Sequence, residues 1–513
     1  MKKIPILQLF LITIVSIGIF FRFGNLDLKP YWYDETYTSL QLSGYTHEEV
    51  KQDILTGRLI GIEDLQKYQY PNKNSDKTVF DTINNIAKQE AQLTPLYFIL
   101  ARYWVEFWGN SVTVIRSLSA IFSLLTIPLT YWLCWQLFNS ASIAWIGMAL
   151  MAVSPFHILY AQESRPYSLW TLTILLSCGL FLRANRQDNK LNWLLYSFSI
   201  ILGLYSFLLN IFVYISHGIY LTITQGFHFT NQVRNYLIST ISGFILFIPW
   251  IYLVIVNVSI KERGFQDENN SLIKYTVKWL RNIGLIFADF NIDDESSKLA
   301  ILFYGIILLF ILILVTYGLY FLYNNAPNNS HIFIFSLILV PAITLTLPDL
   351  MIGGLRAVII RYMIPFLIGI QLVITFLLGK KLTIVQNIKQ QKLWQIIMVI
   401  ILSLGVISGT QITFASTWAN KAIPKNTPET ARIINQAEKP LIISDFWFPN
   451  IISLSYKLDN KVRFQLVEKA ENLKIEKGFS DVFLYQPSED LTQKLNSNYS
   501  LESIEEDLLF KLK

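Results

Sequence analysis

Charged residues are few in this sequence. Asp, Glu, Lys and Arg make up only 15% of its 513 residues, whereas an average soluble protein contains about 25%. The formal net charge of +6 is small for this length and gives no support to a nucleic-acid partner. Because 53% of the residues are hydrophobic and the mean hydropathy is +0.41, the composition excludes an ordinary soluble protein and indicates an integral membrane protein.

Cysteine is almost absent, and so is a small-residue cleavage site near the N-terminus. Cys134 and Cys178 both lie inside apolar runs, so they supply neither a disulfide framework nor a cysteine-rich metal site. The N-terminal stretch MKKIPILQLFLITIVSIGIFF has a basic start and an apolar centre but no small-residue cleavage site. We therefore expect a retained first transmembrane helix.

Long apolar runs dominate what is present. A membrane-spanning helix needs about 20 apolar residues. Runs of this kind cover residues 4–22, 112–138, 142–160, 167–183, 192–208, 210–224, 236–257, 299–323, 331–349, 362–379 and 393–411. They predict an α-helical polytopic membrane protein with about 11 transmembrane helices.

One further stretch decides the topology. LTPLYFILARYWVEFWG, at residues 93–109, is short, begins near a proline and contains Arg102 and Glu106. Short loops rich in Lys and Arg stay cytoplasmic. If this stretch lies along the membrane surface, the N-terminus, RANRQDNK and KKLTIVQNIKQQK all fall on the cytoplasmic side. We therefore predict an amphipathic interfacial helix here and a multi-pass protein of the inner (plasma) membrane with a cytoplasmic N-terminus.

The same topology places four loops and a C-terminal domain outside, beginning with the long first loop at residues 23–111. AQESRPY forms a short turn, and longer loops follow at residues 258–298 and around IGGLRAVIIRY. After residue 411, PLIISD, KVRFQLV and DVFLYQP indicate strands, and PETARIINQAE and EDLTQKL indicate helices between them. We expect a transmembrane domain at 1–411 and a small external, periplasmic-side α/β domain at 412–513.

Ionisable residues gather on this outer side. They are Asp34, Glu35, Glu163, Arg165, Arg356 and Arg361. Such groups near the hydrocarbon are costly and usually face a cavity or a partner. For each one alone, an ion pair that only fixes loop packing is the alternative. Their shared side favours a functional site.

The segments that carry these residues resemble the GT-C superfamily of membrane glycosyltransferases. YWYDETYTSL is similar to its acidic first-loop motif. AQESRPYSLW is similar to its second acidic motif, in the form found in bacterial relatives of protein O-mannosyltransferases and lipid A aminoarabinose transferases. TPLYFILARYWVEFWGNSVTVIRS resembles the interfacial helix and second span, and RYMIPFL a late Arg-Tyr segment. The resemblance is strong over residues 1–185 and slight in the tail, and QLTPLY stands where the family often has His-Pro-Pro.

The resemblance implies that a sugar moves from a polyprenyl-phosphate donor to an acceptor on the outer face. Asp34 is then the base that takes the acceptor's proton. Glu35 orients it or binds the acceptor, and Glu163 is a second acidic group at the acceptor or sugar. One displacement at the anomeric carbon inverts that centre.

Guanidinium groups offer forked donors to phosphate oxygens. The donor phosphate is therefore assigned to three arginines, which are Arg165, Arg361 and Arg356. Contacts with the sugar or acceptor are assigned to Tyr33, Tyr167 and Tyr362. For the first-loop aromatics, an interfacial belt is an equal alternative.

No cofactor follows with certainty from these residues. Asp34, Glu163 and His47 carry the oxygen and imidazole ligands that a divalent cation takes. No cluster of His or Cys shows metal-ligand spacing, so a metal-free site is the favoured alternative.

Other function classes stay open at this point. An oligosaccharide ligase or polymerase is the nearest alternative. A transporter would place ionisable groups near the midplane of broken helices, whereas these lie at the mouths of loops. A non-catalytic scaffold explains the tail but not the first-loop acids. The expected partners are the polyprenyl-phosphate sugar, membrane lipids, and a glycan, lipid or protein acceptor.

Overall fold

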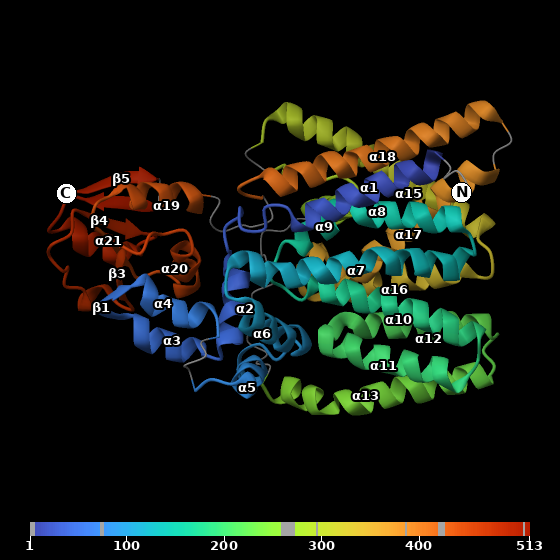
Figure 1. Cartoon of the computed structure of the whole chain (residues 1–513), viewed down its shortest axis with the longest axis horizontal. Helices are drawn as coiled ribbons and strands as arrows, with labels where there is room; N and C mark the ends of the chain where they lie inside the picture. Colours follow the sequence, from blue (N-terminus) through green and yellow to red (C-terminus); the bar gives the residue numbers. More distant parts are fainter. Residues whose placement is uncertain are drawn as a thin grey trace. The chain divides into compact units, whose positions relative to one another are not determined.

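The structure divides into two compact units, each assembled from separate stretches of the chain. It is a computed structural model that describes residues 6–71, 76–257, 272–293, 296–384, 387–418, 426–505 and 508–513. The first unit, which we call the membrane unit, contains residues 1–26, 90–97 and 116–414. The second, which we call the sheet unit, contains residues 27–89, 98–115 and 415–513. Figure 1 shows the elements of both.

The membrane unit is built from helices. They are α1 (Ile6–Phe23), α7 (Val112–Phe138), α8 (Ala141–Val153), α9 (Pro155–Ala161), α10 (Tyr167–Arg186), α11 (Lys190–Ser206), η1 (Leu208–Asn210), α12 (Ile211–Thr224), α13 (Asn231–Asn257), α14 (Leu272–Gly284), α15 (Lys298–Asn325), α16 (Ser330–Ile352), η2 (Arg356–Val358), η3 (Ile360–Met363), α17 (Ile364–Ile384) and α18 (Ile388–Phe414). Every apolar run predicted as a span is therefore mainly helical over its described residues, and the predicted helical membrane fold is confirmed.

Not every helix of the membrane unit is long enough to cross a membrane. Among the described residues, eight helices are long and apolar enough to cross a membrane, and the bent pair α8–α9 makes a ninth. Helix α11 has 17 residues, and η1 with α12 also covers 17, Leu208–Thr224. Both fall slightly below the usual length for a span. The expected 11 crossings stay a prediction.

A buried arginine holds the break between α8 and α9, which are bent by 53°. Pro155 begins α9 and lacks the N–H that would continue the helix, so carbonyls at the end of α8 lose their partners. Arg22 of α1 is fully buried and donates to the carbonyls of Ala152 at 2.5 Å and Met151 at 2.9 Å. It also donates to Ser123 at 2.9 Å. The break is thereby closed by a side chain from another helix.

The stretch at 93–109 does not form a span. Its helix α6 (Leu96–Trp108) has 13 residues, about 20 Å at 1.5 Å per residue. Arg102 is buried and donates to the carbonyls of Leu42 at 2.6 Å and Lys77 at 2.7 Å. In the membrane unit, Arg116 at the start of α7 donates to the carbonyl of Leu26, just after α1, at 2.6 Å. The chain thus leaves and re-enters the membrane unit at the same end.

The sheet unit combines the first loop with the C-terminal tail. Its elements are α2 (Tyr33–Ser43), α3 (His47–Ile54), β1 (Thr56–Gly61), α4 (Ile62–Gln69), α5 (Val79–Gln89), most of α6, α19 (Thr427–Gln436), β2 (Pro440–Ser444), α20 (Phe448–Ser455), β3 (Arg463–Val467), η4 (Ala470–Asn472), β4 (Asp481–Tyr485), α21 (Glu489–Asn496), β5 (Leu501–Glu505) and β6 (Leu509–Leu512). The predicted strands and helices of the tail are confirmed.

One sheet, in the order β1-β3-β2-β4-β6-β5, organises this unit. Strands β3, β2 and β4 are parallel, and β1, β6 and β5 pair antiparallel. Side chains alternate between the faces: Leu441 and Ile443 pack with Leu491 of α21, whereas Ile442 packs with Leu40 of α2. Both faces are covered, as a parallel sheet requires.

Strand β1 comes from the first loop, and Figure 1 shows it in blue beside the red C-terminal strands. It pairs with β3, with Ile60 opposite Phe464. Its sequence, TGRLIG, has no clear alternation, and sequence reasoning did not find it. The domain boundary predicted at residue 412 stays a prediction, and the first loop is grouped here with the tail.

Candidate active site

The turn between α9 and α10 positions Glu163 and Arg165. Pro166 stands just before the first residue of α10, where its fixed φ suits the start of a helix. The N–H of Arg165 donates to the carbonyl of Glu163 at 2.8 Å. Glu163 is fully buried, and Arg165 is 6% exposed. A very short turn between two apolar helices therefore holds two charged side chains inside the membrane unit.

A second layer of hydrogen bonds fixes this turn from α7. The hydroxyl of Ser119 donates to the carbonyl of Arg165 at 3.3 Å. Ser119 also shares a hydrogen bond of 2.9 Å with the hydroxyl of Tyr97. Tyr97 belongs to the TPLY segment, which the sequence analysis matched by resemblance without assigning it a role. Its role in this geometry is to brace the turn that carries Arg165.

The ring of Tyr167 brings two of the predicted arginines together. The guanidinium carbon of Arg165 lies 5.9 Å from the Tyr167 ring centroid, and that of Arg361 lies 5.8 Å from the same centroid. Arg361 comes from η3, far along the chain, and also lies 5.7 Å from the ring of Tyr362. These distances are within the range of cation–π contacts. One tyrosine thus links the second acidic motif to the late Arg-Tyr segment.

Two aromatic residues that sequence reasoning missed support this cluster. Phe207 lies 5.9 Å from Tyr167 and 6.5 Å from Tyr362, between ring centroids. Trp170 stacks on Phe207 at 4.3 Å. Both occur inside ordinary apolar runs, so no signal in the sequence separates them from other packed aromatics. They hold the two tyrosines that carry the arginines.

Arg356 has a different environment. Its guanidinium lies 3.7 Å from the carboxylate of Asp349 at the end of α16, and its side chain is 44% exposed. The Asp349 side chain is completely buried. It also accepts the N–H of Ala357 at 2.7 Å and the hydroxyl of Tyr275 at 3.4 Å. This ion pair fixes η2 against α16 and α14.

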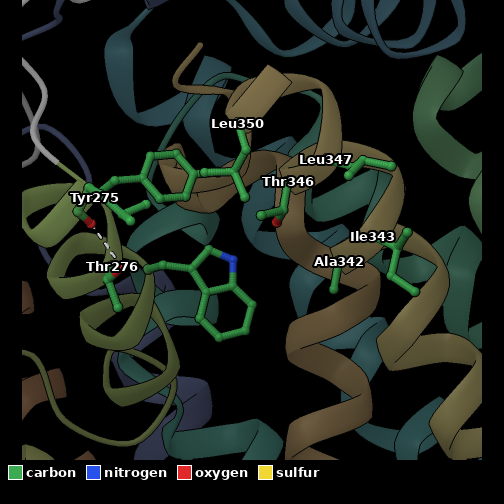
Figure 2. A pocket seen from close by; sticks show the side chains of 9 residues that line it. Tyr275, Thr276, Ala342, Ile343, Thr346, Leu347 and Leu350 are labelled. Carbon is green, nitrogen blue, oxygen red and sulfur yellow. Dashed lines mark hydrogen bonds between the residues drawn. The ribbon is translucent and has the colours of Figure 1, made fainter. Parts of the chain in front are cut away.

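An apolar groove runs beside this ion pair, between α14 and α16. Figure 2 shows Tyr275 and Thr276 on one wall and Ala342, Ile343, Thr346, Leu347 and Leu350 on the other. Its volume is about 440 Å³. Trp279 lines it and packs on Phe366 of α17 with centroids 5.1 Å apart. Phe366 lies in the helix that follows Arg361 directly.

The first-loop acids belong to the sheet unit, where they begin helix α2. Glu35 is fully buried, and its carboxylate accepts the N–H of Trp32 at 3.4 Å. It therefore acts as a cap for the helix start. Asp34 is 8% exposed. Tyr33 packs against Trp447 of the tail, with centroids 5.4 Å apart. A residue of the tail therefore packs on Tyr33, the residue directly before the two acids.

His47 lies in the same unit, at the start of α3. Its ring contacts Tyr37 at 4.8 Å and Phe448 at 6.0 Å. Burial, together with the smaller effect of the charge on Lys51, lowers the pKa of His47 to about 4. The imidazole is therefore neutral at pH 7. Among the described residues no group of three or more His, Cys, Asp or Glu gathers as a metal site.

The structure thus brings the predicted residues together in two groups. Arg165, Tyr167, Arg361 and Tyr362 form one cluster in the membrane unit, on the turn that also carries Glu163. Tyr33, Asp34 and Glu35 form another in the sheet unit. Arg356 lies apart, in its ion pair with Asp349. The catalytic and binding roles of these residues stay predictions.

Comparisons with known proteins agree with the expected resemblance. Residues 92–253 match the family described as Dolichyl-phosphate-mannose-protein mannosyltransferase. That stretch contains α6, α7 and the turn with Glu163 and Arg165. No curated protein matches the chain.

The fold of a solved structure extends over almost the whole chain. ArnT from Cupriavidus metallidurans in the apo state aligns with a TM-score of 0.56 and 10% identity, covering 99% of this chain and 98% of that one. ArnT bound to undecaprenyl phosphate aligns at 0.49, with 11% identity and 98% and 97% coverage. The Archaeoglobus fulgidus oligosaccharyltransferase, in complex with Zn and sulfate, aligns at 0.48, with 12% identity and 98% and 72% coverage.

Proposed function

We propose that this chain, a membrane protein that resembles the GT-C superfamily of glycosyltransferases in both sequence and fold, transfers a sugar from a polyprenyl-phosphate donor to an acceptor. The observation that carries the proposal is the placement of Arg165 and Arg361 over one tyrosine ring. Two guanidinium groups at the end of a helix bundle suit a phosphate attached to a membrane lipid, because each presents a planar fork of donors.

The apolar groove between α14 and α16 suits the isoprenoid chain of such a donor. The surface that lines it is almost entirely apolar, and Trp279 connects it through Phe366 to the helix that follows Arg361. An isoprenoid is uncharged and long, so it needs apolar surface more than it needs hydrogen bonds.

Asp34 is the proposed base. In the step, its carboxylate takes the proton of an acceptor hydroxyl, and the hydroxyl oxygen forms a bond to the anomeric carbon. The bond from that carbon to the phosphate oxygen breaks, and its electron pair stays on the phosphate. Arg165 and Arg361 stabilise the charge that develops there. Glu35 positions the start of α2, and Glu163 is the second acid.

The side of the membrane is part of the proposal. We place the N-terminus in the cytoplasm and the acids, the arginines and the sheet unit on the outer side. The basic connections at Arg183, Arg186, Lys380 and Lys381 support this orientation. A donor sugar must then be presented on the outer face.

Purified protein in nanodiscs tests the function directly. Radiolabelled polyprenyl-phosphate mannose, glucose, galactose and aminoarabinose are supplied separately, with an envelope extract as the acceptor. We expect one donor to lose its label to an acceptor, with inversion at the anomeric carbon. Arg165→Ala protein serves as the comparison variant, because it removes one of the guanidinium groups proposed to bind the phosphate.

The outcomes separate the function classes. Loss of label into a glycan chain rather than onto a single acceptor would favour a ligase or polymerase. Uptake of a labelled lipid sugar into sealed vesicles without any transfer would favour a transporter. No consumption of any donor by folded protein would contradict the proposal.

A further inference from the structure

In the sheet unit, the connections between the parallel strands change direction at the carboxyl ends of β2 and β4. From β2 the chain passes through α20 to β3 on one side, and it then returns to β4 on the other side of β2. The strand order therefore reverses between β2 and β4. In open α/β sheets, ligands bind at the carboxyl ends of strands where the order reverses.

The two loops at this edge are held together by hydrogen bonds. The hydroxyl of Ser444 donates to the carbonyl of Tyr485 at 2.7 Å. The N–H of Ser488 donates to the carboxylate of Asp445 at 2.9 Å. The buried amide of Asn450 reaches the side-chain oxygen of Gln486 at 3.5 Å. The carboxylate of Asp445 and the amides of Asn450 and Gln486 are therefore held in place by hydrogen bonds between the two loops.

An aromatic surface adjoins these polar groups. Trp447 follows Asp445 closely, and 39% of this large side chain is exposed. Its ring lies 5.4 Å from Tyr33 and 5.5 Å from Tyr37. Tyr33 and Tyr37 are one helical turn apart on α2, so they share a face. Tyr33 is also the immediate neighbour of Asp34.

We propose that Trp447, Tyr33 and the polar groups of this edge bind a sugar ring of the acceptor. The inference rests on the proposed function and assigns its acceptor to a chemical class. A sugar ring has C–H groups that pack on the face of an aromatic ring. Its hydroxyls form hydrogen bonds with carboxylate and amide groups. An aromatic surface with a few fixed polar groups meets both requirements. The bound ring would lie one residue from the proposed base.

Binding can be measured without any donor. Full-length protein in nanodiscs is mixed with methyl α-mannoside, methyl α-glucoside, methyl β-galactoside or methyl β-N-acetylglucosaminide. Saturation-transfer NMR with irradiation of the protein's aromatic protons then reports contact with the sugar C–H groups. We expect transfer to at least one glycoside, its loss in Trp447→Ala, and partial retention in Trp447→Phe.

The control is Tyr499→Ala. Tyr499 is 43% exposed in the same unit, but it follows α21, which runs back from the end of β4. This variant should behave as wild type. Absence of saturation transfer to all four glycosides in wild type, or an unchanged signal in Trp447→Ala, would overturn the proposal.

Turnover separates this proposal from the function on which it rests. Trp447→Ala should raise the acceptor KM by roughly twofold to tenfold, the range expected for one aromatic contact, and leave the donor KM unchanged. If the wild type transfers sugar but Trp447→Ala keeps the acceptor KM, only the sugar-binding edge is wrong. If the wild type binds glycosides but consumes no donor, only the proposed function is wrong.

Discussion

The two units of this protein hold their charged residues in different ways. Both units bury charges of both signs, among them Arg22 and Glu163 in the membrane unit and Arg102 and Glu35 in the sheet unit. Arg22 donates to main-chain carbonyls at a helix break, whereas Arg165 and Arg361 lie over tyrosine rings. Glu35 accepts from the main chain at a helix start. The same residue type therefore serves the fold at one place and is available for chemistry at another.

The difference assigns separate tasks to the units. An arginine inside an apolar bundle cannot turn to water, so its partners must come from the protein or a ligand. A carboxylate on an α/β sheet has a more ordinary setting, and its task is decided by what it faces. If the proposal is right, changes in the sheet unit alter the chemical step, and changes at Tyr167 alter donor binding.

The largest effect is expected from Asp34→Asn. The amide keeps the shape of the carboxylate but cannot take a proton, and general-base catalysis contributes about 10²–10⁴-fold. Initial rates over a donor series should show kcat reduced by that order and donor KM nearly unchanged. Glu35→Ala is the companion, since it removes the cap on the N–H of Trp32 and should lower stability more. Full turnover by a folded Asp34→Asn protein would remove Asp34 as the base.

Arg165 and Arg361 should show the opposite pattern. Charge-assisted hydrogen bonds contribute about 1.5–3 kcal/mol each, so Ala at either position should weaken donor binding on the order of tenfold to a hundredfold. Lys should not restore it fully, because an ammonium has no fork. Calorimetry with polyprenyl phosphate alone measures this directly. The control is Arg356→Ala, because Arg356 is already paired with Asp349. An equal loss of donor affinity in all three Ala variants would contradict the special role of Arg165 and Arg361.

Arg22 should affect folding and leave binding unchanged. Arg22→Leu leaves the carbonyls of Ala152 and Met151 without donors, and each buried unsatisfied acceptor costs about 1–3 kcal/mol. Thermal unfolding in detergent should show a clearly lower Tm, with donor affinity preserved in the folded protein. Leu9→Ala, on an exposed side chain of the same helix, should change little. An unaltered Tm together with weaker donor binding would place Arg22 among the ligand contacts.

His47 makes the sheet unit sensitive to acid. Its pKa is about 4 in the folded protein and about 6.5 when unfolded, so the unfolded state binds more protons between these values. The contribution of His47 to the free energy of unfolding is then constant above pH 6.5. It falls as the pH drops towards 4, by up to about 1.4 kcal/mol per pH unit. His47→Phe should remove this part of the slope. His228→Phe, at an exposed position of the membrane unit, should keep it.

The smallest expected effect comes from single cysteines introduced to test the membrane orientation. They should change thiol labelling and leave activity unaltered. Cys134 and Cys178 are both buried, so an impermeant thiol reagent should find little background. Asn498→Cys in the sheet unit should react in intact cells, and Asn325→Cys at the end of α15 should react only after lysis. Ser164 is unsuitable because it is completely buried. The reverse pattern would invert the proposed orientation.

Most of the membrane unit follows from local composition. A long run of apolar residues favours a helix in a bilayer, because a helix satisfies its own backbone hydrogen bonds there. The predicted strands and helices of the tail follow likewise from alternation and turn residues. The motifs with Asp34, Glu163 and Arg361 were found by resemblance, each on its own segment. None of these patterns needs knowledge of distant contacts.

Contacts between distant segments needed the tertiary structure. No period in the chain indicates that β1 of the first loop pairs with β3 of the tail, or that Arg22 closes the break before α9. Nor does any show that Tyr167 lies under both Arg165 and Arg361, whereas Arg356 is paired with Asp349. Sequence patterns decide which segments are apolar, helical or extended, because those are local properties. Which side chains meet depends on packing among segments far apart in the chain, and only the folded molecule determines that.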